Sequence, residues 1–465
     1  MKTILLLSPP LYFSKGIPHS LDSSVPALGL LYLASYINRY SKNIKANIVD
    51  IAAEKLSLDQ VVDIVKKEKP FIVGISSMTP QLQGAVELAH CLKSNFKNLK
   101  IVLGGPHISA DPDFLKRHTN LFDYGITGEA EITLLETLNK LITGKKIPRL
   151  QNGEIIKDLD IIPIPDKKLV NREKYIGYES MMFSRGCPYH CYYCSRPSIS
   201  RMIRYRSAEN VIQEIKYVYK YCHGKIDFQD DTFTLNKEKV VDFCRQAEKT
   251  GLKLDWRCNT RIDLVDEELL KAMKQAGCSL IHFGIEAGNE KIRREIVNKG
   301  QFTNKQIYNI VKLCHKYGIK FAGYFMIGHP GETKKNMEET KKMILGCGAD
   351  LVGLSIPLPF PGSTLYGIAY KQGIINENII DDFADKKLGE GYSGNYPVFT
   401  SEKVSPEYVF SLMKEINRKF YITPKMFWRR FKEDAGSISR LKKDFFDLIS
   451  LISKGMSSRK PYFIK

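Results

Sequence analysis

Residues 181–194 read MMFSRGCPYHCYYC. An apolar run of β type ends in Arg-Gly, and three cysteines follow at the spacing C-x-x-x-C-x-x-C on a segment that Gly186 and Pro188 keep out of regular structure. Three thiolates on one loop predict a metal site, whose candidate ligands are Cys187, Cys191 and Cys194. Zinc structural sites and cuboidal iron–sulfur clusters both take four ligands, so this loop leaves one position open. A zinc site completed by His190 or by a distant residue is the alternative interpretation.

Composition indicates a globular chain of two or three domains. The chain has 465 residues, of which 43% are hydrophobic and 26% charged. Ten cysteines without a paired framework favour a reducing compartment, and the apolar run at residues 3–7 is too short to span a bilayer, so we expect a cytoplasmic protein. The formal net charge is +19, and residues 401–465 hold 15 Lys and Arg against 7 Asp and Glu, but no nucleic-acid fold signature is recognised there.

The first 143 residues alternate short β-rich runs with helical patterns. Strands are expected at Thr3–Leu7, Ala46–Val49, Phe71–Ile75, Ile101–Leu103 and Tyr124–Ile126. Helices are expected at Leu28–Tyr40, Leu58–Lys67, Gln81–Ser94, Pro112–Arg117 and Glu131–Ile142. Five such units predict an α/β domain with a flavodoxin-like, doubly wound parallel sheet.

Glycine and hydroxyl side chains gather at the carboxyl ends of these strands. Ligands of open parallel sheets bind outside this edge, and glycine permits close approach of the backbone. No G-x-G-x-x-G sequence follows the first strand, so a dinucleotide is not indicated. The candidate ligand-binding residues are Ser76, Ser77, Thr79, Gly104, Gly105, Thr127, Gly128 and Glu129.

The rest of the chain divides into three parts. Residues 144–180 lack periodicity and contain the segment IIPIPD, so a linker is expected there. Residues 181–380 repeat the β-α pattern six times and predict a partial (β/α)6 barrel, and residues 381–465 predict an α-helical C-terminal region. The six strands are expected at Met181–Ser184, Ile226–Gln229, Leu254–Asn259, Leu280–Ile285, Phe321–Ile327 and Leu351–Ile356.

Charged residues mark the carboxyl ends of the barrel strands, where active residues of such barrels lie. Asp230 and Asp231 follow the second strand. Arg261 follows the third strand, and Glu286 follows the fourth. A helix N-cap is the structural alternative for Asp231, and a core salt bridge is the alternative for Glu286. Their joint placement at successive strand ends favours a binding site.

The cysteine spacing and the aromatic residue before the last cysteine resemble the signature of the radical S-adenosylmethionine (radical SAM) superfamily. The resemblance implies that the three cysteines hold three irons of a [4Fe-4S] cluster, whose fourth iron is chelated by SAM. Arg261 is then a candidate partner of the SAM carboxylate. Acidic residues stand where the family has Gly-Gly-Glu. The further implied SAM contacts are Tyr193 at the adenine, Asp230 and Asp231 at the amino group, and Glu286 at the ribose.

Residues 1–143 resemble the cobalamin-binding domain of cobalamin-dependent radical SAM enzymes. The Gly-Gly-Pro-His segment at 104–107 and the Thr-Gly-Glu-Ala-Glu segment at 127–131 look like that family's pattern, which implies that they line the corrinoid. The D-x-H-x-x-G sequence that supplies a cobalt ligand in many cobalamin domains is replaced by DIAAE at 50–54. Cobalamin without a protein imidazole on cobalt is therefore expected, and His107 is expected to be a turn residue. A flavodoxin-like module with an interface role is the alternative.

The resemblance implies an enzyme that cleaves SAM reductively to a 5′-deoxyadenosyl radical. With cobalamin present, the implied reaction is methylation of an unactivated carbon, and cobalamin-assisted oxidation or cyclisation is the alternative. The expected partners are a small-molecule or lipid-like substrate and a flavodoxin- or ferredoxin-type electron donor. A methylthiotransferase is disfavoured, because the N-terminal domain contains only Cys91 and so lacks ligands for a second cluster.

A hypothesis from another class is a basic, zinc-stabilised nucleic-acid binder. It accounts for the charge and the cysteines, but the acidic strand ends would repel a phosphate backbone, so no nucleic-acid partner is expected. C-terminal helices are expected at Pro406–Phe420, Lys425–Lys432 and Ile438–Ser453. In the second of these, Phe427, Trp428 and Phe431 lie beside arginines and predict contact with an anionic membrane surface or an acidic substrate. An ordinary amphipathic helix packed on the barrel is the alternative.

Overall fold

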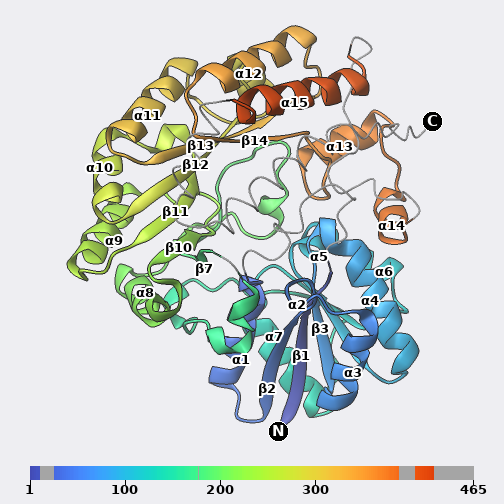
Figure 1. The fold of residues 1–465 in the computed structure, drawn as a ribbon. Coiled ribbons are helices and arrows are strands. Elements are labelled where there is room, and N and C mark those ends of the chain that lie inside the picture. The colour runs from blue at the N-terminus through green and yellow to red at the C-terminus, as the bar shows by residue number, and fades with distance from the viewer. Residues whose placement is uncertain (11–25, 176, 387–403, 424–465) are drawn as a thin grey trace.

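The computed structural model of the chain describes residues 1–10, 26–175, 177–386 and 404–423. This part contains two six-stranded parallel sheets with flanking helices and a two-stranded antiparallel pair (Figure 1). The predicted fold class is confirmed: a doubly wound N-terminal sheet, a partial barrel and a helical region after the barrel.

The first sheet has the strand order β2-β1-β3-β4-β5-β6, and all neighbouring strands are parallel. The chain order reverses between β1 and β3, the place where ligands bind in doubly wound sheets. Strand β1 is buried on both faces, as its continuous apolar run predicts. The strands are β1 (Lys2–Ser8), β2 (Ile44–Asp50), β3 (Ile72–Ser76), β4 (Lys100–Gly104), β5 (Tyr124–Thr127) and β6 (Leu150–Asn152).

Helices cover both faces of this sheet. Leu5 and Leu7 pack against α3 and α4 on one face, and Ile4 and Leu6 pack against α1 and α7 on the other, because successive side chains of a strand alternate. The predicted helices are present, and two short ones, α2 and α5, were not predicted. The helices are α1 (Leu28–Tyr40), α2 (Ile51–Glu54), α3 (Leu58–Glu68), α4 (Leu82–Asn95), α5 (Pro106–Ala110), α6 (Phe114–Arg117) and α7 (Glu131–Ile142).

Part of the segment expected as a linker belongs to the first sheet. Strand β6 pairs with β5, with Leu150 opposite Gly125. Ile156 and Leu159, which follow β6, are buried in a small core with Tyr32 of α1. A three-residue edge strand is too short to give a periodic pattern, so the sequence does not reveal it. The rest of the segment contains the 3₁₀ turns η3 (Leu159–Ile161), η4 (Lys167–Leu169) and η5 (Arg172–Lys174).

The second sheet has the order β7-β10-β11-β12-β13-β14, again with parallel neighbours. Its outer face packs against helices α8 to α12, where Ile281, Phe283 and Phe321 are fully buried, and the alternate residues lie on the inner face. The strands are β7 (Glu179–Met181), β10 (Lys225–Phe228), β11 (Asp255–Thr260), β12 (Cys278–Glu286), β13 (Lys320–Met326) and β14 (Leu351–Ser355). The helices are α8 (Ala208–Cys222), α9 (Lys237–Lys249), α10 (Glu267–Gln275), α11 (Asn304–Lys316) and α12 (Lys334–Gly346).

The strand expected at Met181–Ser184 is divided in two. β7 ends at Met181, and β8 (Ser184–Arg185) pairs in antiparallel fashion with β9 (Arg204–Tyr205). The buried carboxylate of Asp230 accepts hydrogen bonds from the backbone N–H groups of Phe183 and Ser184 at 3.0 and 2.5 Å. These bonds take the place of sheet partners at the break.

After the barrel, the chain returns to the first sheet. α13 (Thr364–Lys371) and α14 (Ile379–Ala384) share a hydrophobic core with α4, and Asp381 of α14 accepts a hydrogen bond of 2.7 Å from Arg117 Nε of α6. Figure 1 shows α14 beside α4 and α6. The segment after the barrel therefore connects the two sheets through buried apolar contacts and an ion pair.

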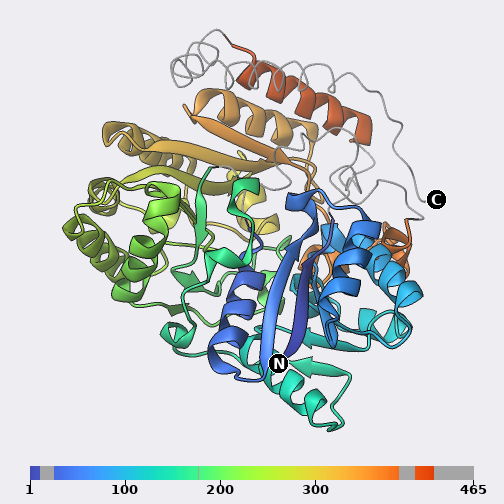
Figure 2. The ribbon, with the colours of Figure 1, turned by 60° about the horizontal axis from the view of Figure 1, so that its bottom comes forward.

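The helix predicted at Pro406–Phe420 is present as α15 (Pro406–Tyr421) and lies along α12 (Figures 1 and 2). The other two predicted C-terminal helices, with the aromatic and arginine residues at 427–432, lie outside the described residues. Within the described ranges, no helix has the length and apolar character needed to cross a membrane.

Candidate active site

The three cysteines lie on one loop, residues 186–203, which β8 and β9 close at its base. Arg185 and Arg204 stand opposite each other in this pair. Gly186 has a φ of 95°, and a Cβ here would lie 2.1 Å from the carbonyl oxygen of Met202. Only glycine fits where the loop begins. Any other residue would clash with the Met202 carbonyl through its Cβ and would have to adopt a left-handed φ.

The thiols of Cys187, Cys191 and Cys194 are free and half-buried. Cys194 Sγ accepts a hydrogen bond of 3.4 Å from the Arg196 N–H, and Cys187 Sγ lies 3.7 Å from Thr232 Oγ1. Burial raises the pKa of the Cys194 thiol to about 11, so a bound metal must stabilise the thiolate. Three soft donors on one loop fit an iron–sulfur cluster with one iron left for another ligand. Among the described residues, no three His, Cys, Asp or Glu side chains form a single-ion site.

Two tyrosines between the second and third cysteines tie the loop to the barrel. The Tyr192 hydroxyl is 2.7 Å from Nδ1 of His329, which follows β13. The Tyr193 hydroxyl donates to Glu286 Oε1 at 2.8 Å, at the end of β12. The two bonds fix the loop over neighbouring strand ends, which is where the sequence predicted that Tyr193 and Glu286 would meet a ligand.

Glu286 is held in an unusual conformation. Its φ is 70°, a value that non-glycine residues seldom adopt, and the residue is 3% exposed. Lys299 Nζ donates to Glu286 Oε1 at 2.6 Å, so the salt bridge that the sequence left as an alternative is present. A Cβ on Gly284 would lie 2.0 Å from Lys299 Nζ, so this glycine makes room for the pair. No motif in the sequence pointed to Lys299.

Arg261 lies beside the cysteine loop. Its guanidinium donates to both carboxylate oxygens of Asp263, at 3.0 and 2.8 Å, and stacks 3.6 Å above the ring of Tyr189. Its Nη1 is buried and has no hydrogen-bond partner in the described part of the chain. One charged donor therefore remains for an anionic group.

The two aspartates after β10 bind protein groups. Asp230 is 1% exposed and accepts hydrogen bonds from the Ser184 hydroxyl as well as from the backbone at residues 183 and 184. Burial raises its pKa to about 6. Asp231 accepts from Arg196 Nε at 2.5 Å. Asp230 thus positions the chain that enters the cysteine loop, and its predicted contact with SAM stays a prediction.

At the carboxyl edge of the first sheet, the backbone itself forms the surface. Gly105 has a φ of 95°, and a Cβ there would lie 2.8 Å from both Ser76 Oγ and Ser77 N. Ser77 N donates to the Gly104 carbonyl at 3.0 Å, and its own carbonyl accepts from the His107 N–H at 3.0 Å. A Cβ on Gly104 would meet nothing within 4 Å. The edge is thus closely packed at Gly105 and open at Gly104.

The remaining polar groups of this edge serve its internal structure. His107 lies in α5, not in a turn as expected, and its Nδ1 is 3.1 Å from Thr79 Oγ1. Burial lowers the pKa of His107 to about 4, so its imidazole is neutral. Thr127 Oγ1 donates to Asn152 Oδ1 at 3.0 Å, and the Gly128 N–H donates to Ser109 Oγ at 2.8 Å.

Glu129, which the resemblance placed at the corrinoid, is an ion-pair partner of the cysteine loop, and its predicted contact with the corrinoid stays a prediction. It is 7% exposed and accepts from Arg204 Nη1 at 2.9 Å and from Arg185 Nη1 at 3.4 Å. Arg185 Nη2 also donates to Glu131 at 2.7 Å. Burial opposes ionisation of Glu129, but hydrogen bonding and the two guanidinium charges outweigh it and lower the pKa. The sequence could not show this pairing, because it joins positions 56 and 75 residues apart.

The two edges meet beside this ion pair. A Cβ on Gly128 would lie 4.0 Å from the Ile199 carbonyl oxygen, in the second half of the cysteine loop. A Cβ on Gly362 would lie 2.3 Å from Ser198 Oγ and 3.2 Å from the Ala110 Cβ at the end of α5. The predicted binding residues of both sheets therefore belong to adjoining surfaces.

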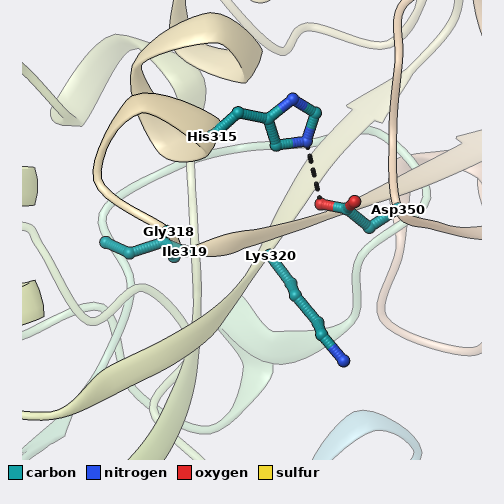
Figure 3. A pocket seen from close by; sticks show the side chains of 5 residues that line it. All are labelled: His315, Gly318, Ile319, Lys320 and Asp350. Carbon is teal, nitrogen blue, oxygen red and sulfur yellow. Dashed lines mark hydrogen bonds and ion pairs between the residues drawn. The ribbon is translucent and has the colours of Figure 1, made fainter. Parts of the chain in front are cut away.

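A surface pocket of about 380 Å³ lies away from this region (Figure 3). Lys320 begins β13 and Asp350 precedes β14, so the pocket is at the amino ends of the barrel strands. In Figure 3, His315 faces Asp350, and their side chains form a hydrogen bond of 3.1 Å. Active residues of such barrels lie at the opposite edge, so this pocket is not the candidate site.

Comparisons with known proteins match two families along the chain. The sequence model of the B12 binding domain matches residues 15–138, and that of the radical SAM superfamily matches residues 181–344. A Pyrococcus horikoshii protein described as an uncharacterized methyltransferase is 32% identical over 458 residues, 94% of this chain and 96% of the relative. An anaerobic magnesium-protoporphyrin IX monomethyl ester cyclase of Rubrivivax gelatinosus is 28% identical and covers 88% of this chain, which spans 80% of the cyclase.

Among solved structures, the radical S-adenosylmethionine methyltransferase TsrM of Kitasatospora setae, with cobalamin and a [4Fe-4S] cluster bound, is similar in fold. The match covers 80% of this chain and 78% of TsrM, with a TM-score of 0.68 and 17% identity. The family matches favour an iron–sulfur cluster over zinc at the cysteine loop and set aside the nucleic-acid binder.

Proposed function

Because this chain belongs to the cobalamin-dependent radical SAM enzymes, we propose that it methylates an unactivated carbon of a small-molecule or lipid-like substrate. The observation that carries the proposal is the ion pairing between Glu129, at the edge of the first sheet, and Arg185 and Arg204, at the base of the cysteine loop. When bound, the cluster supplies an electron to SAM and cobalamin supplies the methyl group. Such enzymes need a reductant, and we propose a flavodoxin- or ferredoxin-type donor for it.

The cysteine loop and the barrel edge bind the cluster and SAM in this proposal. Cys187, Cys191 and Cys194 hold the cluster. Arg261 Nη1, the donor without a protein partner, binds the SAM carboxylate. Tyr193 and Glu286, joined by their hydrogen bond, form the adenosine side of the site, with Asp231 and its partner arginine at the amino side.

The edge of the first sheet binds cobalamin in this proposal, without a protein imidazole on cobalt. Gly104 offers an open backbone surface, which a large planar ring needs for close approach. Asp50 caps α2 through the Ala53 N–H at 3.2 Å and accepts from the Tyr175 hydroxyl at 2.9 Å, so it is committed to the fold. His107 Nδ1 is committed to Thr79, and its side chain is fully buried.

A second candidate, cobalamin-assisted oxidation or ring formation, is favoured by one observation. The relative in Rubrivivax gelatinosus is a cyclase, and it matches this chain over 451 residues. Methylation and cyclisation share every cofactor, so they differ in whether a methyl group leaves the enzyme with the product.

The test is anaerobic reconstitution with iron, sulfide, hydroxocobalamin and a reductant, followed by incubation with SAM that carries a deuterated methyl group. We expect four irons and one cobalamin per chain, with the deuterated methyl appearing on cobalamin. Cleavage of SAM without any methyl on cobalamin would favour the cyclase alternative. Failure to bind cobalamin would overturn both.

A further inference from the structure

The inner face of the second sheet carries a group of polar side chains that the cofactors do not account for. We call Asp227, Arg257, Asn259, His282 and Tyr324 the inner-face cluster; they come from β10, β11, β12 and β13. Their neighbours along the strands face outward into the helix-covered core. Strands of parallel sheets are usually apolar on both faces, so a polar inner face indicates a surface that meets a ligand.

Cross-strand register brings the members of the cluster together. Asp227 lies opposite Arg257, and Asn259 lies opposite His282. Arg257 Nη2 donates to Asp227 Oδ2 at 2.7 Å, His282 Nδ1 is 3.2 Å from Asn259 Oδ1, and the Tyr324 hydroxyl is 3.4 Å from the same Nδ1. The pairs are fixed by the sheet, so the cluster is organised before any ligand binds.

The charges within the cluster cancel. Arg257 is paired with Asp227, and its guanidinium also stacks 4.3 Å from the ring of Tyr178. Its Nε is buried and has no hydrogen-bond partner among the described residues. Burial and the charge of Arg257 lower the pKa of His282, so this imidazole is neutral. The five residues therefore carry no net charge, and the Arg257 Nε–H is the one buried guanidinium donor of the cluster that has no partner among the described residues.

His282 presents a hydrogen-bond acceptor. The Asn259 carbonyl oxygen can only accept, so the shared proton sits on His282 Nδ1, and Nε2 keeps its lone pair. Among the described residues, Nε2 has no hydrogen-bond partner. A neutral donor such as a hydroxyl or a ring N–H would satisfy it.

Tyr324 presents a flat apolar surface next to that acceptor. Its side chain is among the exposed large hydrophobic groups, with 43% of the residue accessible. Gly353 of the edge strand β14 lies opposite Tyr324, and a Cβ there would lie 2.5 Å from the tyrosine ring. The glycine therefore allows the ring to lie across the edge of the sheet.

The cluster lies on the same face as the proposed SAM site. A Cβ on Gly284 would meet Glu286 Oε1 at 2.6 Å, so the face that carries position 284 also carries the Glu286 carboxylate. His282 precedes Gly284 by two residues and so shares that face. At about 3.3 Å per residue, His282 is roughly 13 Å along β12 from Glu286, within the span of one substrate molecule.

We propose that the inner-face cluster is the substrate-recognition site, and that it takes a neutral molecule with a hydroxyl or N–H donor on a flat apolar framework. His282 Nε2 accepts from the donor, and Tyr324 covers the adjacent flat part. This proposal rests on the proposed function of the enzyme and names the class of substrate on which it acts.

The experiment measures binding of three probes to the reconstituted holoenzyme by ligand-observed NMR. Phenol has a hydroxyl donor, anisole has the same ring without a donor, and benzoate has an anionic group. We expect phenol to bind about fivefold to tenfold more tightly than anisole, the contribution of one hydrogen bond, and benzoate to bind more weakly than phenol. His282→Ala should remove the preference for phenol over anisole.

Two further variants separate recognition from folding. Tyr324→Leu should weaken phenol and anisole alike by several-fold, because both lose the flat surface. His315→Ala changes a half-exposed histidine in the pocket at the opposite end of the barrel and should leave the preference unchanged. Equal binding of phenol and anisole to the wild-type enzyme, or a preference that survives in His282→Ala, would overturn the proposal. Tightest binding by benzoate would assign an anion site and overturn it as well. Methyl transfer to cobalamin, measured on the same wild-type sample, reports separately on the proposed function.

Discussion

The two sheets of this chain form their carboxyl edges by different means. At the edge of the first sheet, backbone groups and glycines make the surface, as at Ser77, Gly104 and Gly105. At the edge of the second sheet, side chains in ion pairs and hydrogen bonds make it, as at Glu286 and Arg261. A backbone surface admits the close approach of a large ring, whereas fixed charges suit a small zwitterion such as SAM. The contrast indicates which edge takes which cofactor.

The test with the largest expected effect removes one of the three cluster ligands from the cysteine loop at the second edge. Cys191→Ala leaves two thiolates, which do not hold a cluster with one defined open iron. We expect the iron content to fall far below four per chain and SAM cleavage to fall by more than about a hundredfold, while cobalamin binding to the first edge persists. Iron analysis, cobalamin absorbance and chromatography of 5′-deoxyadenosine measure the three quantities. The buried Cys314→Ala is the control and should keep its cluster.

The next test breaks the ion pair that joins the two edges. Glu129→Gln leaves Arg204 and Arg185 without their shared carboxylate in a buried place, and we expect a loss of about 3–5 kcal/mol in the free energy of unfolding. Glu136→Gln, which alters an exposed helical pair with Lys140, should cost less than about 0.5 kcal/mol. Chemical denaturation measures both. Equal stability of the two variants would show that the buried pair does not join the sheets.

The same pair predicts a pH dependence. Because the folded-state pKa of Glu129 is lower than in the unfolded chain, its contribution to stability is complete above about pH 4.5 and is lost as the pH falls through the folded pKa. The difference in stability between wild type and Glu129→Gln should therefore shrink in acid. A constant difference from pH 7 to pH 3 would contradict the assignment.

Glu332, which lies beside the second edge, predicts the opposite pH dependence: its contribution to stability falls as the pH rises. Its Oε2 accepts from the N–H groups of Gly328 and His329, yet burial outweighs these bonds and raises its pKa to about 7. A carboxyl group with a raised folded pKa favours folding at low pH, and this contribution is lost as the pH rises from about 4.5 to 7, at most about 3 kcal/mol in all. Glu332→Gln keeps an acceptor for both N–H groups and should flatten the curve. Unchanged curvature in urea denaturation between pH 5 and pH 8 would refute this role.

How far the sequence predicted this molecule depends on the range of the interactions. Strand β1, helix α1 and the cysteine loop follow from local patterns, so their positions were predicted within a few residues. Glu129 was predicted to lie at the corrinoid because its segment resembles the cobalamin-binding pattern, and nothing in the sequence indicated that its ion-pair partners come from β8 and β9. Asp230 was predicted to contact SAM because it follows the second barrel strand, and no pattern in the sequence indicated its hydrogen bonds to backbone groups 46 and 47 residues earlier. A pairing between distant charged residues leaves no local pattern.

The smallest expected effect is a difference in the free energy of unfolding between alanine variants of two adjacent glycines of the first edge. Gly105→Ala forces a side chain into a left-handed φ and places Cβ 2.8 Å from Ser76 Oγ and Ser77 N, so we expect a loss of about 1–3 kcal/mol in the free energy of unfolding. Gly104→Ala meets nothing within 4 Å and should change stability by less than about 0.5 kcal/mol.

Cobalamin binding should show the reverse: it should weaken more in Gly104→Ala than in Gly105→Ala. If the ring lies against the open surface at Gly104, the new methyl group fills that surface and weakens binding in Gly104→Ala while the fold stays intact. Titration of cobalamin by absorbance, together with urea denaturation of both variants, gives the comparison. Normal cobalamin affinity in Gly104→Ala would place the ring elsewhere on the first edge and would remove the main reason for assigning the backbone-lined surface to the larger cofactor.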